Sequence, residues 1–380
     1  PEIVLILGES YNKHHAALYG YPLPTTPRLS QEEAAGRLYP FTDVVSPANF
    51  TVKAMHLLFS FASQDRQTAW CDTPLFPALF RRAGYDTLMF DNQTTFTLEN
   101  DDVWDQEIRH FLYHPRLSPQ LFTHCNADKY PFDEGLLADF DRQDLRFRNP
   151  LRLTIFHLMG QHVAYRNRFP AEAGYFTADS IPEYSTSGLR RSRDERRIVA
   201  DYDNAVRYND RVVGEILSDH GEEVFDYAHR NGRIHDATLS PDCCRHQYEI
   251  PFMIWMSDRY RAARPELAAA IARAVDRPYM TDDLPHLLLV RPDAQRRQRP
   301  FRCLAPPIAA RRQGGLRPHH AAGEGQCGNE QGCLIHSQTP LSTSLRNRRI
   351  ARRRSIFPPR RNGSPRPNAV WVQTTSSWAA

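Results

Sequence analysis

The chain has 380 residues, of which 41% are hydrophobic, so it is long enough to bury a large core. The mean hydropathy is −0.58, and no apolar run is as long as about 18 residues. Both observations argue against a membrane-spanning helix in this sequence. The net charge of +4 is unevenly distributed: residues 291–380 carry 17 Arg against three acidic residues, or about +14, so residues 1–290 come to about −10.

The first hundred residues alternate between short apolar runs and segments of helical spacing. Residues 3–7 predict a fully buried parallel strand. Residues 51–61 and 75–83 predict two amphipathic helices, and residues 85–90 predict the next strand. This β–α–β alternation favours a doubly wound sheet.

The rest of the body is less regular. Residues 97–148 are mixed and aromatic, and predict a loop-rich insertion. A strand is predicted at 153–158, followed by a polar loop and a helix that begins near residue 194 and runs into Ser218. We expect a last strand at 248–255 and a last helix at 266–275.

Periodicity ends after Leu289, where the composition turns to Arg, Pro, Gln and Ser. We therefore predict one domain over residues 1–290 and an Arg/Pro-rich tail over residues 291–380, either disordered or translated out of frame. The tail lacks interleaved aromatic residues, so we do not expect a nucleic-acid partner.

Polar residues of the kinds that bind metals follow the apolar strands. Glu9 follows the first strand, His162 follows the strand at 153–158, and Asp219 and His220 lie in a Ser-Asp-His-Gly-Glu run. Ligands of open α/β sheets bind beyond the carboxyl ends of the strands, so we expect these groups to converge. Carboxylates with an imidazole suit a divalent cation, with zinc as the leading choice.

Thr51 stands where the helix at 51–61 begins. A threonine hydroxyl is a poor nucleophile at neutral pH, but a bound divalent metal stabilises its alkoxide. The free backbone N–H groups at the start of a helix would also favour a phosphate oxygen there. The alternative interpretation of Thr51 is an ordinary N-cap residue.

Several segments together resemble one known family. The opening VLILGESYNKHHAALYGYPLPTTPRL is similar to that of the phosphoethanolamine transferase branch of the sulfatase-like, alkaline phosphatase superfamily. SPANFTVKAMHLLFS resembles its nucleophile segment, LMGQH its Gly-x-His strand end, and SDHGEEVFDY its metal-binding motif. YEIPFMIW and MTDDLPHLLL also fit the later core. The resemblance covers about residues 1–290 and implies a catalytic domain with a three-layer α/β/α sandwich fold and a mostly parallel, doubly wound central sheet.

The resemblance also implies a zinc cofactor. Matched residue by residue, Glu9, Asp219 and His220 become zinc ligands, and Thr51 becomes both a ligand and the nucleophile.

Further site residues follow from the same resemblance. His162 matches a histidine that contacts the phosphoryl group or a second metal. His235 is the candidate for another such histidine, and His229 competes with it. Glu222 is expected to support the ligand loop.

The implied activity is the transfer of phosphoethanolamine from phosphatidylethanolamine to a cell-envelope acceptor, either lipid A or a lipopolysaccharide core sugar. It would proceed through a phosphothreonine-type covalent intermediate. The implied location is the periplasmic face of the bacterial inner membrane, with membrane contact through an N-terminal domain that this chain lacks.

Alternatives remain open at this stage. A phosphoglycerol transferase of the lipoteichoic acid synthase type would share the Glu, Thr and Asp-His residues. A sulfatase proper would need a Cys- or Ser-x-Pro-x-Arg segment, and no cysteine of the sequence lies in one. A non-catalytic remnant is the third alternative, because the helix ending near Leu217 meets Ser218 directly. Either 212–217 has become the strand, or a strand-sized piece is missing.

Overall fold

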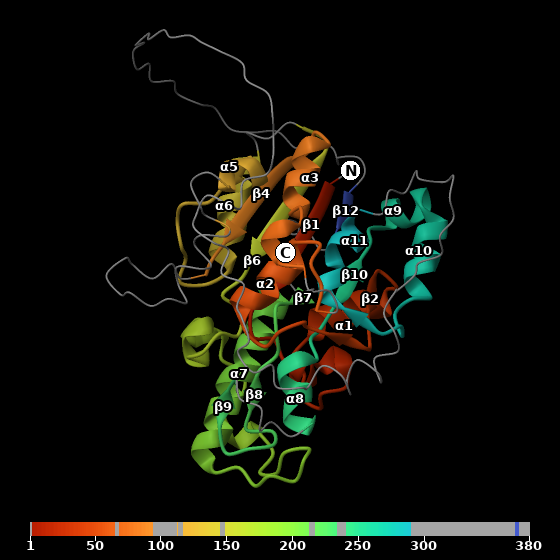
Figure 1. Cartoon of the computed structure of the whole chain (residues 1–380). Coiled ribbons are helices and arrows are strands. Elements are labelled where there is room, and N and C mark those ends of the chain that lie inside the picture. Colours follow the sequence, from red (N-terminus) through yellow and green to blue (C-terminus); the bar gives the residue numbers. More distant parts are fainter. Residues whose placement is uncertain are drawn as a thin grey trace, which may run out of the picture.

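A computed structural model describes residues 2–64, 68–93, 112, 117–144, 149–212, 217–233, 241–289 and 369–371. Its centre is a parallel sheet in which β1 (Glu2–Gly8), β6 (Arg152–His157) and β4 (Asp86–Asp91) lie in that order (Figure 1). The short strand β5 (His124–Cys125) pairs with the other edge of β4. The other edge of β1 pairs with two short strands in succession. Its first residues pair with β12 (Ala369–Trp371), and its last two residues pair with β7 (Leu217–Ser218). All of these pairings are parallel, as predicted.

Helices cover both faces of this sheet. Leu5 and Leu7 of β1 pack in a core with α2 (Thr51–Phe59) and α3 (Phe76–Arg82). Val4 and Ile6 face the opposite side, where they share a core with α1 (Pro27–Ala34) and α6 (Glu134–Asp144). The alternation follows from the two-residue period of a strand. The three-layer α/β/α fold predicted from the sequence is therefore confirmed.

The remaining elements surround this core. Three small sheets pair β2 (Leu38–Pro40) with β10 (Met253–Trp255), β3 (Val44–Val45) with β11 (Tyr279–Met280), and β8 (Glu223–Val224) with β9 (Asn231–Gly232). The other α-helices are α5 (Ser118–Leu121), α7 (Arg193–Val212), α8 (Pro241–Tyr248), α9 (Asp258–Ala263), α10 (Pro265–Ala272) and α11 (Leu284–Leu288). Short 3-10 helices are η1 (Lys13–His15), η2 (Ala17–Tyr19), η3 (Trp70–Asp72), η4 (Tyr165–Arg168), η5 (Ala171–Ala173), η6 (Ala178–Ser180) and η7 (Thr281–Asp283). None of the described helices is both long and apolar enough to cross a bilayer.

Two predicted elements differ from the structure. The sequence predicts a loop-rich segment at 97–148, but the described part at 117–144 contains α5, α6 and the sheet strand β5, with Leu136 and Phe140 of α6 buried. The strand predicted at 248–255 is reduced to β10, which pairs antiparallel with β2 outside the central sheet. Pro251 offers no N–H to a ladder, which favours the shorter strand.

The structure also shows which elements precede Asp219 in the chain, namely a helix and a short strand. Helix α7 ends at Val212, and β7 consists of Leu217 and Ser218 alone. A short strand therefore precedes the Asp-His pair, and residues 213–216 lie outside the described residues. Of the predicted tail, residues 369–371 form β12, and the remainder also lies outside the described residues.

Candidate metal centre

Glu9 and Asp219 meet because the strands that precede them are paired. Leu7 lies opposite Leu217, and Gly8 lies opposite Ser218. The Asp219 N–H continues the ladder by donating to the Gly8 carbonyl oxygen at 3.2 Å. Two carboxylates that are far apart in the sequence thus leave the same edge of the sheet at neighbouring positions.

The loop after β7 orients His220. A Cβ added at Gly221 would lie 2.1 Å from the His246 carbonyl oxygen, so only glycine fits this contact. His220 Nδ1 lies 2.8 Å from the Gly221 carbonyl oxygen and donates its proton there. The Nε2 atom of His220 therefore keeps its lone pair for a ligand on the side of Glu9 and Asp219.

Thr51 completes the group from the start of α2. Phe50 is the N-cap residue of this helix, and Thr51 is its first helical residue. The Thr51 hydroxyl donates to Glu9 Oε2 at 3.0 Å and lies 3.3 Å from His220 Nε2. Its side chain thus contacts the candidate ligands instead of capping the helix, which disfavours the N-cap interpretation.

We call Glu9, Thr51, Asp219 and His220 the Glu9 cluster. His220 Nε2 lies 3.2 Å from both Glu9 Oε1 and Asp219 Oδ2, so the separations in the cluster run from 3.0 to 3.3 Å. Ligand atoms about 2.0–2.2 Å from a tetrahedral zinc ion would stand roughly 3.3–3.6 Å apart. Asp219 Oδ2 is buried and accepts no hydrogen bond from the residues that the structure describes. The donor set and its spacing therefore fit a zinc ion.

The electrostatics of the cluster also favour a cation. Burial and the nearby Glu9 charge raise the pKa of Asp219 well above its ordinary value. Burial would raise the pKa of Glu9 too, but His220 and Arg233 hold it well below its usual range. Burial lowers the pKa of His220, so its imidazole is neutral, as a metal ligand requires.

Arg233 is a neighbour of the cluster that sequence reasoning missed. It follows the β8–β9 hairpin, which returns the chain to the site. Its Nη1 atom lies 2.6 Å from His220 Nε2 and 4.0 Å from Glu9 Oε1, and its Nε atom lies 3.8 Å from Glu222 Oε2. Both strands of this hairpin are only two residues long, so no alternation in the sequence could have indicated it.

The predicted histidines have different outcomes. His162 is half-buried, donates from Nδ1 to the Val163 carbonyl oxygen, and lies close enough to Glu9 to help lower the pKa of that carboxyl. His235 lies outside the described residues. His229 is exposed and forms an ion pair with Glu195 at 2.7 Å, away from the Glu9 cluster.

Glu222 lies behind the Glu9 cluster, in a position that allows a supporting role. It is buried and accepts a hydrogen bond from the Tyr165 hydroxyl at 2.9 Å. Burial raises its pKa to about 7, although the Arg233 charge opposes that shift.

A second buried group, unforeseen from the sequence, lies near the first. Glu223, Asp226 and His246, which we call the Asp226 cluster, also bring three possible ligand atoms within 4.8 Å of one another. Asp226 contacts His15 Nε2 and His246 Nδ1, each at 3.1 Å, and Arg191 Nη2 at 2.8 Å. Cationic and ring N–H groups already surround this carboxylate.

Comparison with known proteins places this architecture. The family model described as Sulfatase matches residues 1–290. The chain belongs to the sulfatase family. Phosphoethanolamine transferase EptC of Escherichia coli O18:K1:H7 is 31% identical over 304 residues, which are 75% of this chain and 49% of that protein.

Two further proteins bear on the site. The crystal structure of the C-terminal periplasmic domain of EptC from Escherichia coli in complex with zinc is 26% identical, with a TM-score of 0.60 over 76% of this chain and 80% of that domain. Kdo(2)-lipid A phosphoethanolamine 7''-transferase of Escherichia coli K12 is 26% identical over 71% of this chain and 47% of that protein. The chain thus spans about half the length of the relatives it matches.

Proposed function

We propose that this chain carries the catalytic site of a zinc-dependent phosphoethanolamine transferase. The observation that carries the proposal is the Thr51 hydroxyl, which contacts both Glu9 and His220 at the start of α2. The zinc complex of the EptC domain and the names of the relatives support both the metal and the transferred group.

In this proposal Glu9, Thr51, Asp219 and His220 would hold the ion. A bound zinc ion would lower the pKa of the Thr51 hydroxyl and make it a nucleophile at neutral pH. The free N–H groups in the first turn of α2 stand where they can stabilise negative charge on a phosphoryl oxygen.

The reaction would use Thr51 twice. Thr51 Oγ1 bonds to the phosphorus of phosphatidylethanolamine as the bond to the diacylglycerol oxygen breaks, and the Thr51 proton passes to that leaving oxygen. The acceptor oxygen then bonds to phosphorus as the Thr51 bond breaks, and the acceptor proton returns to Thr51. His162 and His235 remain proposed contacts of the phosphoryl group.

The acceptor that we propose is lipid A or a core sugar of lipopolysaccharide. One relative is named for a Kdo(2)-lipid A acceptor, which supports this class. Because the proposed donor is a membrane lipid, we propose that the site works at a membrane surface, at the periplasmic face of the inner membrane.

Incubation of the whole chain with zinc and phosphatidylethanolamine tests the proposal. We expect release of diacylglycerol and a chain heavier by one phosphoethanolamine group, attached at Thr51. Thr51→Ala should lose both signals while it still binds zinc. Thr42→Ala, which alters an exposed threonine, is the matched control and should keep both signals. Modification of the Thr51→Ala chain, or turnover by it at the normal rate, would contradict the assignment.

The same assay separates the serious enzymatic alternative. A phosphoglycerol transferase would consume phosphatidylglycerol and leave phosphatidylethanolamine intact. A non-catalytic remnant would consume neither lipid.

A further inference from the structure

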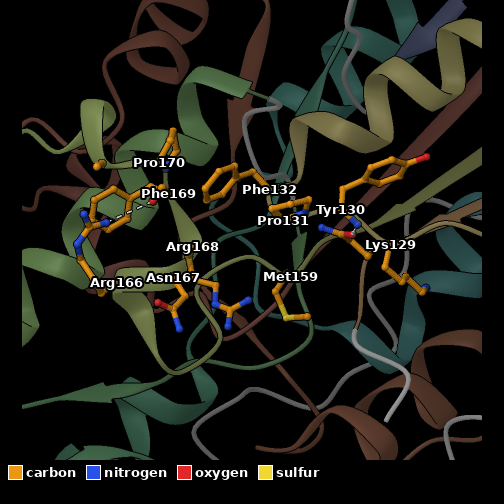
Figure 2. Close-up of a pocket in the computed structure, with 12 residues that line it drawn as sticks. Lys129, Tyr130, Pro131, Phe132, Met159, Arg166, Asn167, Arg168, Phe169 and Pro170 are labelled. Atoms are coloured by element: carbon orange, nitrogen blue, oxygen red, sulfur yellow. Dashed lines mark hydrogen bonds between the residues drawn. The ribbon is translucent and has the colours of Figure 1, made fainter. Parts of the chain in front are cut away.

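A cavity of about 670 Å³ lies beside the Glu9 cluster. Its walls come from residues 129–132 on one side and from Met159 and residues 166–171 on the other (Figure 2). Both segments lie beyond the carboxyl ends of sheet strands, the first after β5 and the second after β6. We call this cavity the Arg168 pocket.

The pocket and the Glu9 cluster are neighbours. Asn92 lines the pocket, and the next residue, Gln93, reaches Glu9 Oε2 with its Nε2 atom at 3.5 Å. On the other wall, Met159 lines the pocket, and the Gln161 N–H donates to the Glu9 carbonyl oxygen at 2.9 Å. A group bound in the pocket would therefore lie close to the proposed reacting centre.

Arg168 is the feature of the pocket that calls for a ligand. Its Nε atom is buried without a hydrogen-bond partner, and its guanidinium forms no ion pair in the part of the chain that the structure describes. Burial lowers its pKa, although the charges of Asp133 and Glu9 act against that shift. The Asp133 carboxylate already accepts hydrogen bonds from the Asn92 side chain and from the N–H groups of Met159 and Gly160.

A half-buried guanidinium without a carboxylate partner is costly, and an anionic group with two oxygens would satisfy it. Arg166 adds a second positive charge at the rim, while Lys129 is paired with Asp91 at 2.7 Å. This charge disfavours the ammonium group of the donor. It favours a negatively charged molecule instead.

The other walls are apolar. Phe132, Phe169 and Met159 line the pocket around Arg168, and the Arg166 guanidinium lies 4.7 Å from the centre of the Phe169 ring. Apolar walls with a few placed polar groups are typical of small-molecule sites. They suit a ring that carries C–H surface together with an anionic substituent.

We propose that the Arg168 pocket is the acceptor subsite and that Arg168 binds a phosphate or carboxylate group of an anionic acceptor sugar. The inference rests on the proposed transferase function, since it assigns the second substrate of that site. It makes Arg168 a determinant of acceptor specificity and leaves the donor half-reaction to the Glu9 cluster.

Binding of glucosamine 1-phosphate to the zinc-loaded whole chain, followed by NMR, tests the pocket without any turnover. We expect Arg168→Gln to weaken this binding about tenfold or more, in keeping with the loss of a charge-assisted bidentate contact. Arg168→Lys keeps the positive charge but not the two parallel N–H donors of the guanidinium. Its affinity for glucosamine 1-phosphate should lie between those of the unaltered chain and Arg168→Gln. The exposed Arg193→Gln variant is the matched control, and neutral N-acetylglucosamine is the control ligand.

The kinetic arm separates the two substrates. In Arg168→Gln, diacylglycerol release without acceptor should stay within about twofold of the unaltered chain, while the acceptor KM rises about tenfold. Glucosamine 1-phosphate binding that is equally strong in Arg168→Gln would overturn the proposal, and so would an equal loss of donor cleavage. If the unaltered chain cleaves no donor, the proposed function fails. The glucosamine 1-phosphate binding experiment then still shows whether Arg168 binds an anionic sugar.

Discussion

The Glu9 cluster and the Asp226 cluster look alike as sets of residues, since each offers two buried carboxylates and a buried histidine. Their surroundings differ. In the Glu9 cluster two carboxylates share one site, and no described residue donates a hydrogen bond to Asp219 Oδ2. In the Asp226 cluster His15 and Arg191 supply positive charge, and no buried side-chain atom of its three residues lacks a hydrogen-bond partner within the described chain.

The comparison shows that donor atoms at suitable distances are not sufficient for a metal site. Glu223 Oε1 already accepts hydrogen bonds from the N–H groups of Asp226, Tyr227 and Ala228, and so stabilises the turn after β8. The His15 ring bridges Asp203 and Asp226 at 2.7 and 3.1 Å. We interpret the Asp226 cluster as a structural network that holds the ligand loop, and the Glu9 cluster as the site whose donor atoms and charge suit a cation.

The same substitution in the two clusters should have opposite effects on the metal-free chain. Asp226→Asn removes the carboxylate that pairs with the buried Arg191 and one of the two carboxylates that contact His15, and should lower the free energy of unfolding by about 3–5 kcal/mol. Asp219→Asn removes one of two repelling carboxylates, and should leave stability unchanged or raise it by about 1–2 kcal/mol. Urea unfolding of both variants without zinc provides the measurement. Equal losses in the two variants would remove the distinction between the clusters.

The pH dependence of stability should reveal the Asp226 cluster. Burial lowers the pKa of His15, but Asp226 and Asp203 outweigh it and raise that pKa to about 10. The stabilisation from the His15 charge is complete below the unfolded pKa near 6.5 and is lost as the pH rises through about 10.

Unfolding free energy should therefore fall by roughly 3–4 kcal/mol between about pH 7 and about pH 10. Denaturation at several pH values measures this slope, and His15→Gln should flatten it. A slope that persists in His15→Gln would assign the titration to another group.

Arg233 should have a smaller effect, on the metal. Its guanidinium donates to His220 Nε2, the atom that would bind zinc, and its charge repels a divalent cation. Arg233→Gln should therefore tighten zinc binding by up to about tenfold, or about 1.4 kcal/mol. Competition with a chromogenic chelator measures the affinity. Weaker zinc binding in this variant would mean that Arg233 organises the ligands instead of opposing the ion.

Much of the fold could be predicted because strong local signals agreed with the final structure. The apolar run at 3–7 became β1, and the helical spacing from Thr51 became α2. The Glu9 cluster could be anticipated because parallel strands end at one edge of the sheet, so that residues following β1 and β7 are neighbours.

Other features depend on contacts that a single sequence does not display. The two-residue strand β5 is too short for its period to be recognised. Arg233 reaches the Glu9 cluster only through the β8–β9 hairpin. The Asp226 cluster joins His15 and Asp203 to residues 223–246, and no local pattern links these segments. Whether a buried carboxylate is paired or left to a metal is a property of the assembled interior.

Zinc content of the whole chain, measured after dialysis against a small excess of zinc, tests the central claim most directly. The matched variants are His220→Gln in the Glu9 cluster and His246→Gln in the Asp226 cluster. We predict zinc bound by the unaltered chain, lost in folded His220→Gln and retained in His246→Gln. Zinc that persists in His220→Gln, or that disappears in folded His246→Gln, would contradict the assignment of the metal to the Glu9 cluster.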